Sequence, residues 1–139
     1  MEIAEFERRL VGRLCWACGG MTHRSHLRQW QCRHCRAKWS YRRLRQRWEL
    51  MRLYCSGTGL KRAAAASGVS ERTARAAFSR FRTILRQQPA SLWRYTHPFA
   101  DVPRPPHVRA SLAAVFFTAE FLPKIEMRMR ARRASQPPG

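Results

Sequence analysis

Four cysteines near the start of the chain constrain its fold more than any other feature. They form two pairs with the same spacing, Cys15-x-x-Cys18 and Cys32-x-x-Cys35. Each pair can point two thiolates at one metal ion, and the 13 residues between the pairs are enough for a hairpin that brings them together. The sequence therefore predicts a four-cysteine zinc ribbon over residues 14–41, with one structural Zn²⁺ and no coordination position left open for a substrate.

Short strands and basic side chains are expected around these cysteines. Residues 29–31 and 37–40 have strand patterns on either side of the second pair. His23, His26 and His34 could compete as ligands, but four cysteines already satisfy the metal. Four basic side chains of the ribbon are predicted to contact phosphates: Arg28, Arg33, Arg36 and Lys38.

The chain is strongly basic, with 28 Lys and Arg against 8 Asp and Glu and a formal net charge of +20 over 139 residues. Such a surface attracts phosphate polyanions and releases counterions when it binds them. The first residues carry Glu2, Glu5 and Glu7 and have no signal-peptide core. No apolar run is long enough to cross a membrane. We therefore expect a cytoplasmic protein with reduced thiols, in which Cys55 is a buried apolar residue.

A helix-turn-helix pattern follows the cysteines, within residues 42–88. Residues 42–55 form one helical segment, and Leu60 to Ser67 form a second, alanine-rich one. Gly68 stands where a helix needs a left-handed residue to end, and Ser70 is a good N-cap for the next helix. A helix, a glycine turn and a capped helix in this order are typical of a helix-turn-helix.

The helix after Ser70 is expected to have two different faces. One is apolar and predicted to face the core: Ala74, Ala77, Phe78, Phe81 and Leu85. The other is polar and mostly basic: Arg72, Arg75, Ser79, Arg82 and Arg86. We favour nucleic-acid contact over a solvated face, because acidic partners one turn away are not apparent there.

Position along this helix divides the predicted roles. In a helix-turn-helix the first two turns of the second helix reach base edges, and later turns meet the backbone. The predicted base-reading residues are Arg72, Thr73 and Arg75. The predicted phosphate-binding residues of this helix are Ser79, Arg80 and Arg82.

The remaining segments are predicted from their composition. Residues 1–13 form a short packing helix, residues 89–107 a proline-rich linker, and residues 108–139 an amphipathic helix with a disordered tail. The C-terminal stripe consists of Leu112, Val115, Phe116, Ala119 and Leu122, widened by Phe117 and Phe121. Two interpretations stay open for it. The stripe closes the core, or residues 108–133 bind another protein or a second copy of the chain. The expected fold class is mainly α with a small β zinc ribbon.

Residues 14–86 resemble the DNA-binding regions of insertion-sequence transposases, especially small accessory or regulatory proteins without the catalytic domain. The matching segments are CWACGG, then QWQCRHCRAKWS, then GLKRAAAASGVSERTARAAFSRFRTIL. Trp30 and Trp39 match aromatic positions of that family, whereas Arg36 stands where the family usually has glycine. The resemblance implies binding of transposon ends or of a promoter, as a transposition accessory factor or repressor associated with the bacterial nucleoid.

No catalytic residues are predicted, and the chain is not expected to be an enzyme or to bind a small-molecule substrate. Transposases of this kind need three carboxylates to hold two metal ions. After the linker only Asp101, Glu120 and Glu126 remain, and the last two fall on different faces of a helix. The leading hypothesis is therefore non-catalytic, sequence-specific binding of double-stranded DNA.

Two other functions remain open. The chain could be an assembly subunit that docks its C-terminal helix on a transposase, a recombinase or an RNA-guided machine. It could also bind RNA, with Trp16, Trp30 and Trp39 stacking on unpaired bases.

Overall fold

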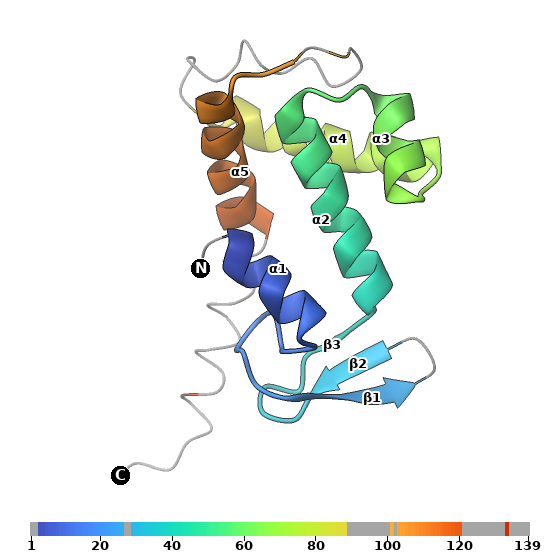
Figure 1. Ribbon diagram of the computed structural model, residues 1–139, viewed down its shortest axis with the longest axis vertical. Coiled ribbons are helices and arrows are strands. Elements are labelled where there is room, and N and C mark those ends of the chain that lie inside the picture. Colours follow the sequence, from blue (N-terminus) through green and yellow to red (C-terminus); the bar gives the residue numbers. More distant parts are fainter. Residues whose placement is uncertain (1–2, 27–28, 89–100, 102, 121–132, 134–139) are drawn as a thin grey trace. The chain divides into compact units, whose positions relative to one another are not determined.

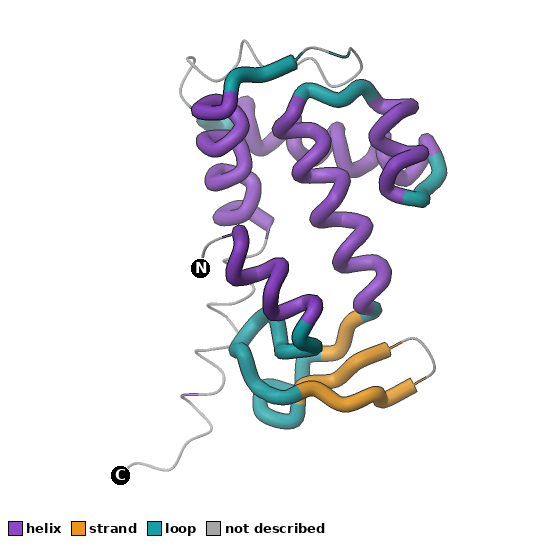
Figure 2. The backbone as a smooth tube through the Cα atoms, in the orientation of Figure 1, coloured by secondary structure: helices purple, strands orange, loops and turns teal. Residues whose placement is uncertain are grey.

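A computed structural model describes residues 3–26, 29–88, 101, 103–120 and 133. The chain divides into two compact units, Met1–Arg45 with Glu120–Gly139 and Gln46–Ala119, so the boundary falls inside α2 (Tyr41–Ser56). The described strands all belong to the first unit, and the second is helical (Figure 2). The predicted class, mainly helical with a small β part, is confirmed at that level. None of the described helices has both the length and the apolarity needed to cross a membrane.

The first unit begins with α1 (Ile3–Val11), which ends earlier than the predicted residue 13. Leu14 N donates to Arg9 O at 2.8 Å, and Arg13 takes a left-handed backbone with φ 57°. This arrangement terminates a helix, and its left-handed position is usually glycine. Phe6, within the predicted packing helix, is fully buried.

Three antiparallel strands follow in the order β1 (Thr22–His26), β2 (Gln29–Cys32) and β3 (Lys38–Trp39), as Figure 1 shows. Trp30 pairs with Arg24 on β1 and with Trp39 on β3. The strand prediction for residues 29–31 is confirmed. β3 is shorter than the predicted 37–40, because Ala37 O accepts a hydrogen bond from Cys32 N at 2.9 Å and belongs to the turn around the second cysteine pair.

The second unit contains most of α2, together with α3 (Leu60–Ser67), α4 (Glu71–Arg86) and α5 (Pro106–Glu120). The predicted features of the α3–α4 turn are present. Gly68 has φ 68°, and Val69 N donates back to Ala64 O at 3.1 Å. Ser70 Oγ accepts from Thr73 N at 3.1 Å and caps α4.

Tyr54 of α2 lies at the centre of an aromatic cluster in the second unit. Its ring centroid lies 5.0 Å from that of Phe78, 5.4 Å from that of Phe81 and 5.4 Å from that of Phe116. Contacts between aromatic rings of this kind stabilise the fold beyond the effect of burying their apolar area. Cys55, the next residue, is 3% exposed, as predicted for an apolar cysteine.

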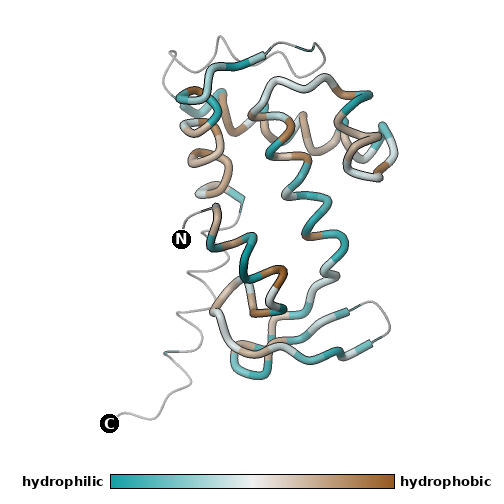
Figure 3. Tube along the Cα trace, in the orientation of Figure 1, coloured by the Kyte–Doolittle hydropathy of each residue, from teal (hydrophilic) through white to brown (hydrophobic). Residues whose placement is uncertain are grey.

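α5 contributes to the same cluster and is mostly coloured as hydrophobic in Figure 3. It begins at Pro106, before the predicted residue 108, because proline suits the first turn of a helix. Its buried residues are Val108, Leu112, Ala113, Phe116 and Phe117. The predicted stripe was placed slightly off this face, since Val115 and Ala119 are only half-buried. Within the described residues, α5 helps to close the core of its own unit, and residues 121–132 of the predicted docking segment lie outside the description.

Two residues of the predicted proline-rich linker form contacts with helices of the second unit. Asp101 Oδ1 accepts from Gly59 N at 2.5 Å, at the N-terminus of α3. Arg104 is buried, donates to Tyr54 O, and places its guanidinium 4.9 Å from the centroid of the Tyr54 ring. Residues 89–100 lie outside the described part of the chain.

Candidate metal centre and nucleic-acid interface

The four predicted ligands come together in the first unit. The sulfurs of Cys15, Cys18, Cys32 and Cys35 all lie within 4.8 Å of one another. Cys15 Sγ is 3.6 Å from Cys35 Sγ, and Cys18 Sγ is 3.4 Å from Cys32 Sγ. Ligand sulfurs about 2.3 Å from a tetrahedral metal lie about 3.8 Å apart. The separations therefore fit one metal ion held by four sulfurs.

Two similar turns position these sulfurs. Gly19 N donates to Cys15 O at 2.8 Å after the first pair, and Arg36 N donates to Cys32 O at 3.1 Å after the second. The residue closing each turn is left-handed, with φ 76° at Gly19 and 62° at Arg36. The turn therefore forms even though Arg36 stands where the resembling family usually has glycine. Arg36 adopts a left-handed conformation that is unfavourable for residues with a side chain.

Backbone donors surround the sulfurs and shift their acidity. Burial raises the pKa of the Cys15 and Cys18 thiols above the ordinary value. Burial acts the same way on Cys32, but His34 N and Cys35 N donate to its sulfur at 3.3 and 3.4 Å, and the net effect lowers the Cys32 pKa. Amide donors that stabilise a thiolate also suit a metal-bound sulfur, since metal ligands must be deprotonated.

Among the described residues the metal-binding cluster contains only the four cysteines, so none of the three histidines joins it. The His34 ring lies close to the cluster without entering it. A Cβ added at Gly20 would lie 2.5 Å from His34 Cδ2 and 3.3 Å from the sulfurs of Cys18 and Cys32. Gly20 is therefore required by this close approach.

The basic candidates of the first unit are solvent-exposed. Arg33, Arg36 and Lys38 are exposed and form no ion pair with a described carboxylate. Arg28, the fourth candidate, lies outside the described residues. Trp16, one of the three proposed stacking residues, is only 7% exposed. It cannot offer a ring face to a base without rearrangement.

α4 separates an apolar face from a basic one, as predicted. Its buried residues are Ala74, Ala77, Phe78, Phe81, Ile84 and Leu85. The predicted DNA-contacting residues are exposed: Arg72, Thr73, Arg75, Ser79, Arg80 and Arg82. Ala76 and Thr83 are exposed between them and were not singled out from the sequence, although their helical spacing places them on that face.

Carboxylates near Arg75 modify the sequence-based account of this face. Arg75 lines a pocket of about 340 Å³ together with Glu71 and Asp101. Glu71 is the acidic partner four residues earlier, which the sequence interpretation overlooked. A phosphate or base edge approaching Arg75 would therefore compete with negative charge already present.

Thr73 has a second role beside its predicted one. Its backbone N–H donates to Ser70 Oγ, and its hydroxyl accepts from the same Ser70 side chain at 3.0 Å. The hydroxyl keeps its own proton for donation.

Comparison with protein-family models, curated proteins and solved structures found no match. The resemblance to transposase DNA-binding regions thus rests on the motifs within residues 14–86. The geometry provides two kinds of chemistry: a closed set of four sulfurs for a metal, and exposed rows of guanidinium groups for an anionic partner.

Proposed function

We propose that the protein is a non-catalytic, sequence-specific double-stranded DNA-binding protein with one structural zinc ion. The observation that carries the proposal is α4, whose exposed arginine face lies opposite its buried face and follows a glycine turn and a serine cap. This order of turn, cap and two-faced helix supports a helix-turn-helix. Transposition accessory factor or repressor is the role that the sequence resemblance favours.

Zinc is the metal that this donor set favours. Four cysteine sulfurs in a tetrahedral arrangement are typical of structural zinc sites, and no ligand position is left for chemistry. The ion would hold the two cysteine turns together in a segment with few buried apolar side chains.

α4 would enter the major groove with its first two turns. Arg72, Thr73 and Arg75 lie there and would read base edges, an arginine pairing with guanine O6 and N7. Ser79, Arg80 and Arg82 lie further along and would contact phosphates. On the zinc unit Arg28, Arg33, Arg36 and Lys38 would add phosphate contacts that carry no sequence information.

Selection of duplexes from a random pool, followed by binding titrations at several salt concentrations, tests this division. Arg75→Ala should cost about 1–3 kcal/mol on the selected sequence and little on random duplex, because a base contact is lost. Arg33→Ala should weaken both alike and reduce the salt slope by about 0.9, which corresponds to one phosphate.

Arg109→Ala is the matched control, since Arg109 is an exposed arginine on α5 rather than on α4. It removes the same charge and should leave the ratio of specific to random binding unchanged. Equal losses on both duplexes for Arg75→Ala and Arg33→Ala would contradict the assigned roles. Absence of any duplex preference in the unmodified protein would contradict the function itself.

A further inference from the structure

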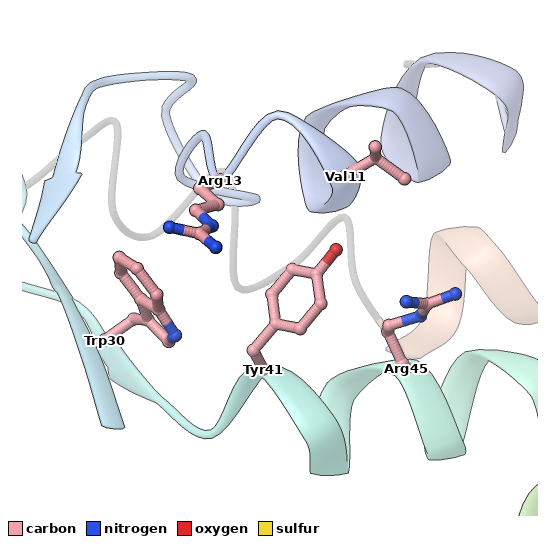
Figure 4. A pocket seen from close by; sticks show the side chains of 5 residues that line it. All are labelled: Val11, Arg13, Trp30, Tyr41 and Arg45. Atoms are coloured by element: carbon pink, nitrogen blue, oxygen red, sulfur yellow. The ribbon is translucent and has the colours of Figure 1, made fainter. Parts of the chain in front are cut away.

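A second surface in the first unit includes none of the residues assigned to duplex binding. Five side chains line a pocket of about 380 Å³: Val11, Arg13, Trp30, Tyr41 and Arg45. They come from the end of α1 and the residues after it, from β2 and from the start of α2. Figure 4 shows the Arg13 guanidinium reaching toward the space between the Trp30 and Tyr41 rings.

Cations and aromatic rings alternate in this pocket. The Arg13 guanidinium carbon lies 5.2 Å from the centroid of the Trp30 ring, and that of Arg45 lies 5.8 Å from the Tyr41 ring centroid. Both rings are half-buried and so keep part of their surface open. No carboxylate lines the pocket, and neither arginine forms an ion pair within the described residues. The site therefore suits a ligand that is both flat and anionic.

The backbone of Arg13 has an energetically unfavourable conformation. Its backbone is left-handed with φ 57°, a conformation that side chains disfavour, and Thr22 Oγ1 donates to its carbonyl oxygen. Strain of this kind persists where the surroundings impose it and is concentrated at functional sites. Val11, at the same pocket, is 68% exposed and adds open apolar surface there.

We infer that this pocket binds an unpaired nucleotide, with its base stacked on the rings of Trp30 and Tyr41 and its phosphate held by Arg13 and Arg45. Stacking on aromatic rings and on guanidinium planes, beside a basic groove, is how single-stranded nucleic acid is bound. The volume lies at the small end for ligand pockets, so it suits one nucleotide. This site goes beyond the proposed function, because reading of a duplex by α4 needs no unpaired base.

The test uses the metal-loaded full chain and a fluorescein-labelled single strand of ten thymidines, with binding followed by anisotropy. Tyr41→Leu should weaken binding on the order of tenfold, the loss of one stacked base, whereas Tyr41→Phe should bind like the unmodified protein. Arg13→Gly should weaken binding severalfold. Since glycine accepts a left-handed backbone, this variant removes the guanidinium while favouring the native fold.

Arg43→Ala is the matched control, because Arg43 is an exposed arginine of α2 that does not line the pocket. It should lower affinity less than Arg13→Gly does. An abasic strand of the same length should bind weakly and should not distinguish Tyr41→Leu from the unmodified protein. Tighter binding of a uridine strand through the same residues would support the site and show that the bound nucleotide comes from RNA rather than DNA.

The inference is overturned if Tyr41→Leu and Arg13→Gly bind the thymidine strand like the unmodified protein. It is also overturned if the abasic strand binds as tightly, since the pocket would then recognise charge alone. Duplex affinity is measured in parallel on the same variants. The duplex selectivity of Arg75→Ala tests the proposed function, and the single-strand affinity of the pocket variants tests this inference. The two hypotheses can therefore fail separately.

Discussion

At the scale of single residues, two arginines have a backbone conformation that normally belongs to glycine. Arg13 and Arg36 are the non-glycine residues with positive φ in the described part of the chain. Arg13 follows the end of α1 and lines the pocket that contains Trp30 and Tyr41, and Arg36 closes the turn after Cys35. Each arginine therefore has a backbone conformation that lowers stability, and each is a proposed contact for an anionic partner.

Replacing Arg36 by glycine should make the metal-loaded protein more stable by about 1 kcal/mol, because the left-handed penalty is removed. The midpoint of chemical denaturation measures this change. The same variant should bind duplex more weakly, since a candidate phosphate contact is lost.

Gly19→Ala provides the comparison, because Gly19 occupies the equivalent position with φ 76°. Gly19→Ala should lower the stability of the protein by about as much as Arg36→Gly raises it. A loss of stability in Arg36→Gly would mean that the arginine side chain contributes more through its contacts than its backbone costs.

Local spacing explains which site residues the sequence could predict. Gly68 and Ser70 act on neighbours within a few positions, and the cysteines form two local pairs with a recognisable spacing, so their roles are readable from the chain. The pocket around Arg13 and Tyr41 is different. It joins residues from three parts of the chain that only tertiary folding brings together, so no local sequence pattern predicts it.

At the scale of elements, α3 begins without a capping side chain of its own. Its N-cap is Gly59, and the acceptor for Gly59 N is the Asp101 carboxylate, 42 positions along the chain. A carboxylate at a helix N-terminus also interacts favourably with the helix dipole. Arg62 lies 3.6 Å from the same carboxylate, but it is 76% exposed, so this ion pair adds little.

Asp101→Ala should lower the free energy of unfolding by about 1 kcal/mol, the usual effect of losing an N-cap. Denaturation of the metal-loaded protein measures it. Asp101→Asn is the control, because it keeps an oxygen acceptor and loses only the charge, and its effect should be smaller. Equal stability of all three proteins would show that Asp101 does not cap α3.

The helices were more predictable than the connections between them. Apolar spacing on α4 identified its buried face, since a surface helix must bury one stripe. On α5 the apolar residues surround most of the helix, and periodicity alone could not decide which side packs. Asp101 and Arg104 were missed because a proline-rich composition gives no sign of distant contacts.

At the scale of the whole molecule, two compact units depend on different sources of stability. We expect the first unit to depend on the sulfur cluster that it contains, and the second on the aromatic cluster around Tyr54. Metal removal should therefore unfold the first unit and leave the helices of the second.

Alkylation at pH 8 before and after chelation measures this difference cysteine by cysteine. After chelation Cys15, Cys18, Cys32 and Cys35 should react, because they lose both metal and structure. Cys55 should stay unmodified, since burial raises its pKa to about 12 and keeps the thiol neutral. Modification of Cys55 together with the other four would show that the units unfold as one.

The same shift makes the second unit sensitive to alkali. Cys55 has a higher pKa folded than unfolded, so folding favours the protonated thiol. Its contribution to stability is complete below the ordinary value of 9.0 and is lost as pH rises toward about 12. Cys55→Ala should flatten that part of the stability profile.

The hydrogen bond between Asp101 and Gly59 also has a consequence for the order of folding events. Contacts between α3 and α4 join near neighbours in sequence, whereas this bond must close a loop of 42 positions. Closing a longer loop costs more entropy, so such contacts tend to form after local ones. The bond should therefore be absent from the rate-limiting transition state. It would prolong the lifetime of the folded second unit while leaving the speed of its formation nearly unchanged.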